Sequence, residues 1–225
     1  MPTEALWQAG QMTMATISRT RMALAGWTMT LAVLYIVIDL VLQLLPPHYS
    51  VVSDAESNLA VGPFGWVMQI NFASRAVMSG CLVATIWLAA PASRRKSVGC
   101  LLIAFAGLCS LALVFFATDV NRPGEFGMTP RTLVGTVHVV FATAGFVGIL
   151  IGMLVLLPWV TKAIRGPGPT IFLTIALAGL LLLGASLLIY PQVAGLAERL
   201  CLVGILGWAF VVSLGLRRDL TRVPG

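Results

Sequence analysis

Six apolar runs, each long enough to cross a lipid bilayer, dominate this sequence of 225 residues. They cover residues 22–45, 65–90, 98–118, 133–159, 170–190 and 197–216. A transmembrane helix needs roughly 20 mostly apolar residues. Each run is continuously apolar, whereas the strands of a membrane barrel alternate apolar and polar residues. The runs therefore predict an all-α integral membrane protein, built as a bundle of six transmembrane helices.

The composition leaves no room for a separate soluble domain. Charged residues make up 10% of the chain and the mean hydropathy is +0.97, whereas soluble domains carry about 25% charged residues. We expect a cytoplasmic N-terminal segment at 1–21, one six-span membrane domain at 22–216 and a cytoplasmic tail at 217–225. The first residues lack the short apolar core of a signal peptide, so the first run should stay in the protein.

Basic residues gather on one side of this topology. The residues that flank the runs on that side are Arg19, Arg21, Arg94, Arg95, Lys96, Lys162, Arg165, Arg217, Arg218 and Arg222. Because basic loops remain in the cytoplasm, we expect both termini there. The short loops and the absence of glycosylation acceptors predict a bacterial inner membrane. Because these basic residues sit at span ends, we expect membrane lipids, not nucleic acid, as partners.

Motifs of several cofactor and enzyme classes are missing from the sequence. It has no nucleotide-binding glycine loop, no pair of deep histidines for haem and no arginine ladder of a voltage sensor. The four cysteines, without a CxxC pair, are expected to pack in the apolar runs. Gly148 and Gly152, four residues apart, are expected to bring two helices of this chain close together.

Polar side chains inside the runs are the strongest functional signal. An ionisable group there costs about 2.5–3.5 kcal/mol on insertion scales, so it usually faces a partner or a cavity. The groups that fall in or next to the non-cytoplasmic halves of the runs are Asp39, Asn71, Arg75, Asp119, His138, Glu198 and Arg199. This one-sided distribution predicts a cavity that opens to the outer side of the membrane.

The connection before the second run carries a helix-start pattern. Ser53-Asp54-Ala55-Glu56 has the S-x-x-E form of a capping box, and Ser57 and Asn58 follow it. We expect a short interfacial segment on the outer surface. It would be either a lid over the cavity or a capped surface turn.

Two interpretations need no reaction. In the first, Asp39 or Asp119 neutralises Arg75, and the protein is a structural or assembly subunit with internal charge pairs. In the second, a lipid head group or a small anion binds from the outer side, held by two arginines and by nearby polar groups. The side chains of that predicted site are Arg75, Asn71, Arg199, Ser53, Asp54 and Asn58.

The third interpretation is an intramembrane enzyme of the hydrolase type. Asp39, Asp119 and His138 would bind a divalent metal that activates water. Alternatively, His138 would act with a carboxylate as a general base. A metal is the less favoured cofactor, because no H-x-x-x-H or H-E-x-x-H spacing occurs.

Four short motifs resemble those of a known family. In chain order they are Ser53-Asp54, Gly62-Pro63-Phe64-Gly65-Trp66, Phe115-Phe116-Ala117-Thr118-Asp119 and Gly135-Thr136-Val137-His138. This order resembles the six-span membrane family catalogued as domain of unknown function 998, over roughly residues 28–216. That family is distantly similar to six-span proteins of the DRAM autophagy-modulator type. Ala117 stands where the family usually has proline. The resemblance implies the six-span fold and no particular reaction.

Overall fold

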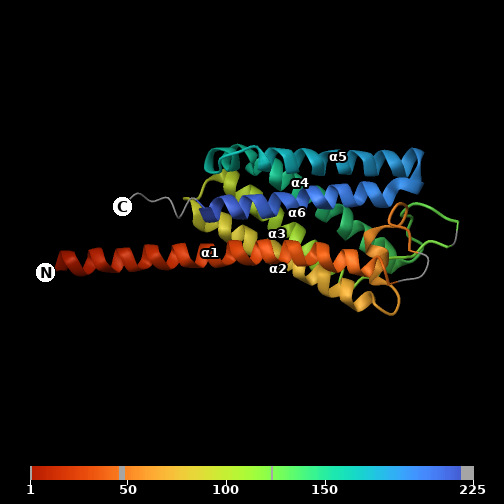
Figure 1. The fold of residues 1–225 in the computed structure, drawn as a ribbon, viewed down its shortest axis with the longest axis horizontal. Helices are drawn as coiled ribbons and strands as arrows, with labels where there is room; N and C mark the ends of the chain where they lie inside the picture. The colour runs from red at the N-terminus through yellow and green to blue at the C-terminus, as the bar shows by residue number, and fades with distance from the viewer. Residues whose placement is uncertain (1, 46–48, 123, 219–225) are drawn as a thin grey trace.

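The computed structural model describes residues 2–45, 49–122 and 124–218. Within these ranges it contains helices and no strand. The six α-helices are α1 (Pro2–Leu42), α2 (Gly65–Ala89), α3 (Arg94–Ala112), α4 (Leu133–Ala163), α5 (Gly168–Ile189) and α6 (Ala194–Arg218). Each is long and apolar enough to span a membrane. The prediction of an all-α membrane bundle of six helices is confirmed (Figure 1).

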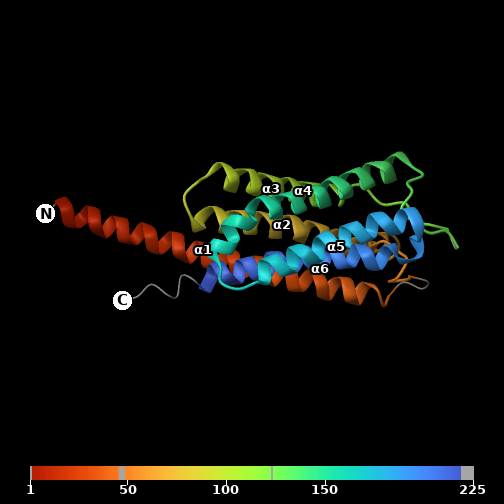
Figure 2. The same cartoon turned by 90° about the horizontal axis from the view of Figure 1, so that it is seen from above.

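Helices adjacent in sequence pack side by side through the first four, from α1 to α4. α5 and α6 form the most extensive pair, α6 also packs on α1, and α4 touches α5 and α6 much less. Figure 2 shows α3 and α4 on one side of the bundle and α5 and α6 on the other. α6 ends at the end of the bundle from which α1 projects (Figure 1). We call the opposite end the distal end.

Two helices differ from their predicted limits. α1 begins at Pro2, so the predicted N-terminal segment continues directly into the first span. α3 ends at Ala112 and not near 118; beyond it, the Phe116 carbonyl lies 2.7 Å from Nδ1 of His138 in α4. The segment after α3 is thus held against α4 by this hydrogen bond. Of the predicted tail, residues 219–225 lie outside the described ranges.

The Gly148 and Gly152 pair brings α4 against α3. A Cβ on Gly148 would lie 3.1 Å from the ring of Phe105, and one on Gly152 would lie 3.1 Å from Ile103. These positions have no room for a larger side chain without movement of a neighbour. The predicted close helix contact within the chain is confirmed.

A second glycine contact, which the sequence did not single out, joins α5 to α6. A Cβ on Gly179 would overlap the backbone of Cys201, and a Cβ on Gly204 would overlap the backbone of Ala176. Small residues at such contacts let helix backbones approach closely in membranes. The close approach explains why α5 and α6 form the most extensive helix pair.

Three connections lie at the distal end. The α1–α2 connection contains a short 3-10 helix, η1 (Glu56–Ala60), and a second one, η2 (Pro191–Val193), precedes α6. The α3–α4 connection runs to Thr132, which caps α4 by accepting the backbone N–H of Gly135 at 2.9 Å. These connections position the polar side chains described next.

Candidate functional site: a cavity at the distal end

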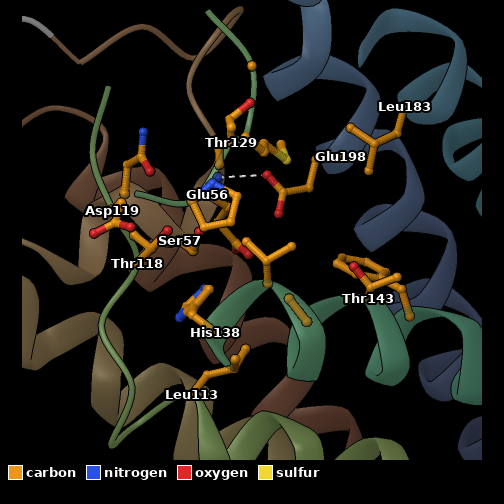
Figure 3. Close-up of a pocket in the computed structure, with 18 of the residues that line it drawn as sticks. Glu56, Ser57, Leu113, Thr118, Asp119, Thr129, His138, Thr143, Leu183 and Glu198 are labelled. Atoms are coloured by element: carbon orange, nitrogen blue, oxygen red, sulfur yellow. Dashed lines mark hydrogen bonds between the residues drawn. The ribbon is translucent and has the colours of Figure 1, made fainter. Parts of the chain in front are cut away.

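A cavity of about 160 Å³ lies at the distal end, bounded by η1, the α3–α4 connection and helices α2, α4, α5 and α6 (Figure 3). Its apolar lining includes Phe72, Leu113, Val139, Ala142, Phe146 and Leu183. Its ionisable and amide side chains are Glu56, Asn58, Arg75, Asp119, His138 and Glu198. The structure thus brings four of the predicted site residues together with two acids.

The cavity extends in two directions. A narrower void of about 30 Å³ shares Arg75, Ala142 and Phe146 with it and continues toward the middle of the bundle. Thr143 of α4 and Leu187 of α5 line the cavity and are also exposed on the surface of the bundle. The cavity therefore opens to the surface of the bundle at α4 and α5.

Two buried acids, Glu56 and Glu198, form one wall. Their exposed fractions are 3% and 7%. Oε2 of Glu198 accepts the backbone N–H of Glu56 at 2.8 Å, the bond drawn in Figure 3. Oε2 of Glu56 accepts the hydroxyl of Tyr35 in α1, also at 2.8 Å. The backbone of η1 is thus bonded to α6, and the side chain of Glu56 is bonded to α1.

The pKa of Glu56 is raised to about 8, chiefly by burial. The neighbouring carboxylates of Asp39 and Glu198 contribute to this rise, whereas Arg75 and the Tyr35 hydroxyl oppose it. Glu56 is therefore protonated at neutral pH unless a cation enters the cavity.

Arg75 does not pair with the acids that the sequence suggested. Its Nε donates to the hydroxyl of Ser110 at 2.8 Å, and its NH1 group donates to the Tyr35 hydroxyl at 3.3 Å. Within the described ranges, neither Asp39 nor Asp119 forms an ion pair with it. The predicted pairing is wrong, because Arg75 bonds to two hydroxyls, while Asp39 accepts from Gln43 and Asp119 from the start of α4.

His138 is held by the backbone and not by a carboxylate. It is 2% exposed, and its Nδ1 lies 2.7 Å from the carbonyl oxygen of Phe116. A carbonyl only accepts, so Nδ1 carries the hydrogen. Nε2 is buried and has no hydrogen-bond partner. The carboxylate-oriented general base that the sequence suggested is not formed.

Asp119 serves the start of α4. Its Oδ2 accepts the backbone N–H groups of Arg131 and Thr132 at 2.7 and 2.8 Å. The bonds from Thr132 and Arg131 lower the pKa of Asp119. Gly135 leaves the space that this carboxylate occupies, since a Cβ there would overlap it. The known preference of a helix N-terminus for an anion on its N–H groups accounts for this aspartate.

The predicted metal triad does not assemble. Asp39 accepts a hydrogen bond from the side-chain amide of Gln43, just after the end of α1, and does not line the cavity. Asp119 is engaged by α4, and His138 by Phe116. Among the described residues, no three His, Cys, Asp or Glu side chains form a group that could hold a metal ion. The residues present do not fit the divalent metal.

Arg199 and Asn71 lie outside the cavity. The NH1 group of Arg199 donates to the carbonyls of Val51, Asp54 and Gly195 at 3.0–3.2 Å. It holds the α1–α2 connection on α6. The amide nitrogen of Asn71 donates to the Tyr35 carbonyl at 3.2 Å, which joins α2 to α1.

The capping box predicted at 53–56 is wrong. η1 begins at Glu56 itself, with Ala55 before it and no side-chain cap. Asp54 instead accepts the backbone N–H of Ser50 at 2.9 Å, and Ser53 contacts Asp54. The predicted short segment before α2 does exist, but Glu56 turns inward to Tyr35. Ser53 and Asp54 line a separate surface groove of the distal connections, which Asn58 shares.

The sequence analysis assigned Glu56 to a helix cap and Glu198 to the start of a span. It did not predict that the two residues are in contact. One signal was available. Glu198 lies in the first turns of an apolar run, as Asp39 and His138 lie within theirs. Its acidic partner could not be found this way, because Glu56 lies in a connection 142 residues away.

Comparisons with known proteins place the chain in a family. No curated protein and no solved structure matches it. A family model described as "Protein of unknown function (DUF998)" matches residues 29–215. The matched range runs from within α1 to within α6 and contains every cavity residue named above. Because the match covers well over half of the sequence, the chain belongs to the DUF998 family of membrane proteins.

Proposed function

We propose that this protein binds the polar head group of a membrane lipid in the distal cavity, with the acyl chains along the outer surface of α4 and α5. The observation that carries the proposal is the shape of the cavity. Its polar groups lie at one end of a membrane-spanning bundle, and its rim reaches the lipid-facing surface at Thr143 and Leu187. Lipid head groups lie at this level, just beyond the hydrocarbon core.

The chemistry of the lining supports a bound molecule. Membrane proteins bury ionisable groups at a cost, and such groups usually face ligands or water-filled paths. Here Glu56, Glu198 and His138 are each more than nine-tenths buried, and one nitrogen of His138 has no partner. A largely apolar pocket with a few converging polar groups is typical of a ligand site.

A cavity-filling substitution tests the proposal. Ala142→Phe places a ring where both voids meet, so we expect the amount of co-purifying lipid in native mass spectrometry to fall by roughly tenfold or more. Val140→Phe is the matched control, because Val140 lies two residues away on α4, is 59% exposed and does not line the cavity. Equal lipid retention by both variants would remove the basis of the proposal.

We also propose that both chain ends lie in the cytoplasm and that the cavity faces the outer side of a bacterial inner membrane. The basic residues named in the sequence support this orientation through the positive-inside rule. Arg94, Arg95, Lys162, Arg165 and Arg217 all lie at or beyond helix ends opposite the distal end.

A further inference from the structure

The unpartnered nitrogen of His138 indicates which kind of ligand group the cavity would accept. Because Nδ1 donates to the Phe116 carbonyl, the Nε2 atom of a neutral imidazole carries a lone pair and accepts. Nε2 is buried, and leaving it without a partner costs about 1–3 kcal/mol. A ligand that satisfies it must donate a hydrogen bond.

The acids beside His138 have the same requirement. Glu56 and Glu198 line the same cavity; a cation beside them favours their ionised forms, and ionised carboxylates only accept. Arg75, the one arginine among the lining residues, already donates hydrogen bonds to Ser110 and Tyr35. With Asp119 at the rim, three acids face one arginine among the residues that line the cavity. This balance favours a cation over the anion that the sequence suggested.

The size of the cavity limits the cation. A cavity of about 150 Å³ holds one benzene molecule, and this one measures about 160 Å³. An ethanolammonium group fits such a space, whereas a hexose or inositol head group is much larger. A serine head group would fit less well for another reason, since it adds a carboxylate beside Glu56 and Glu198.

We infer that the cavity selects a primary ammonium group, which donates to Nε2 of His138 and to the carboxylates of Glu56 and Glu198. This inference rests on the proposed lipid-binding function and names its head-group class, that of aminophospholipids. The ammonium would bring the positive charge that the buried acids need in order to ionise. Choline, which carries no N–H, can supply the charge but not the hydrogen bonds.

The test uses the full-length protein stripped of lipid in detergent and measured by native mass spectrometry. The probes are dioleoyl phosphatidylethanolamine, its N-methyl and N,N-dimethyl forms, phosphatidylcholine and phosphatidylglycerol. These keep the acyl chains constant while the number of N–H donors falls from three to none. We expect affinity to fall with each methyl group, and by roughly tenfold or more over the series. Phosphatidylglycerol, with hydroxyl donors but no cation, should also bind more weakly.

Two variants tie the selectivity to the cavity. Glu198→Gln keeps an oxygen for the backbone N–H of Glu56 but removes the charge, and His138→Phe keeps a ring but removes the acceptor. Each should lower the preference for ethanolamine over choline by roughly tenfold. Glu125→Gln is the control, because this distal carboxylate is 44% exposed, pairs with Arg131 and does not line the cavity. If His138→Phe does not fold, Glu198→Gln alone still decides the matter.

The outcomes separate the inference from the proposed function. Equal affinity for all five lipids, lost in Ala142→Phe, would overturn the ammonium site and leave lipid binding standing. No binding of any lipid or of free ethanolamine, or binding unchanged by Ala142→Phe, would overturn both. Binding of free ethanolamine without binding of any lipid would retain the ammonium site and overturn the lipid as its source.

Discussion

At the scale of single residues, each buried acid of the cavity has a neutral hydrogen-bond donor. Glu56 accepts from the Tyr35 hydroxyl, and Glu198 accepts from a backbone N–H. A carboxyl group can accept such a bond whether or not its other oxygen is protonated. The site can therefore hold its geometry in both states, which a direct ion pair with Arg75 would not allow.

The raised pKa of Glu56 predicts a pH-dependent stability. With a pKa of about 8 in the fold against 4.5 in the unfolded chain, its contribution is complete below pH 4.5 and is lost as pH rises through 8. At about 1.4 kcal/mol per pKa unit, this loss has an upper limit of roughly 5 kcal/mol. We expect the melting temperature in detergent to fall between pH 5 and pH 8.5. Glu56→Gln should remove most of that fall.

The control for this experiment is Glu125→Gln, which changes an exposed acid at the same end of the bundle. It should follow the wild-type pH profile. Parallel profiles for wild type and Glu56→Gln would mean that Glu56 is ionised in the fold at neutral pH, contrary to our account.

Arg199 should act on stability and not on binding. Arg199→Met leaves the carbonyls of Val51 and Asp54 without their donor, at a cost of about 1–3 kcal/mol. We expect a lower melting temperature, together with normal lipid retention by the folded fraction in native mass spectrometry. Arg122→Met, on the exposed α3–α4 connection, should change neither. Selective loss of lipid from a stable Arg199→Met protein would return this arginine to the binding site.

The candidate site was only partly predictable at this scale. His138 and Arg75 stood out because ionisable groups are rare in apolar runs. Their partners did not, because a hydroxyl, a backbone carbonyl and a connection glutamate carry no distinctive sequence signal. The S-x-x-E spacing at Ser53 was misleading, since a tertiary bond from Tyr35 outweighs the local cap at Glu56.

At the scale of helices, the α5–α6 contact predicts opposite effects for two glycines. A Cβ at Gly204 would overlap the backbone of Ala176, so Gly204→Ala should destabilise the protein by about 1–3 kcal/mol. Gly184, in α5, has nothing within 4 Å of its Cβ position. Gly184→Ala should be neutral or slightly stabilising, because alanine favours helix by up to about 1 kcal/mol over glycine. Melting temperatures of both variants in detergent check this, and equal values would contradict the close contact.

The helices themselves were predictable because hydrocarbon thickness sets their length. The end of α3 was not, since an apolar run continues through Phe115 and Phe116 after the helix stops. Hydropathy shows which segments can lie in lipid. It does not show where a backbone carbonyl forms a hydrogen bond with a side chain of another helix, as Phe116 does with His138. The pairing of α5 with α6 was equally hidden, because single glycines are common in membrane helices.

At the scale of the whole molecule, the proposed orientation predicts which surface residues a membrane-impermeant reagent can reach. In intact cells, a membrane-impermeant maleimide should label Arg122→Cys at the distal end but not Arg95→Cys, and both should react once the membrane is opened. The wild-type protein, whose four cysteines lie in the helices, is the background control. Labelling of Arg95→Cys alone in intact cells would reverse the orientation.

The weak contact between α4 and α5 has a consequence for the molecule as a whole. The cavity has one wall on α2–α4 and another on α5–α6, and these two groups touch each other less than their own members do. Any molecule bound in the cavity therefore contacts both groups of helices. The free energy of its binding therefore stabilises the contact between α2–α4 and α5–α6. A conformational change that separates these two groups of helices also releases the bound molecule.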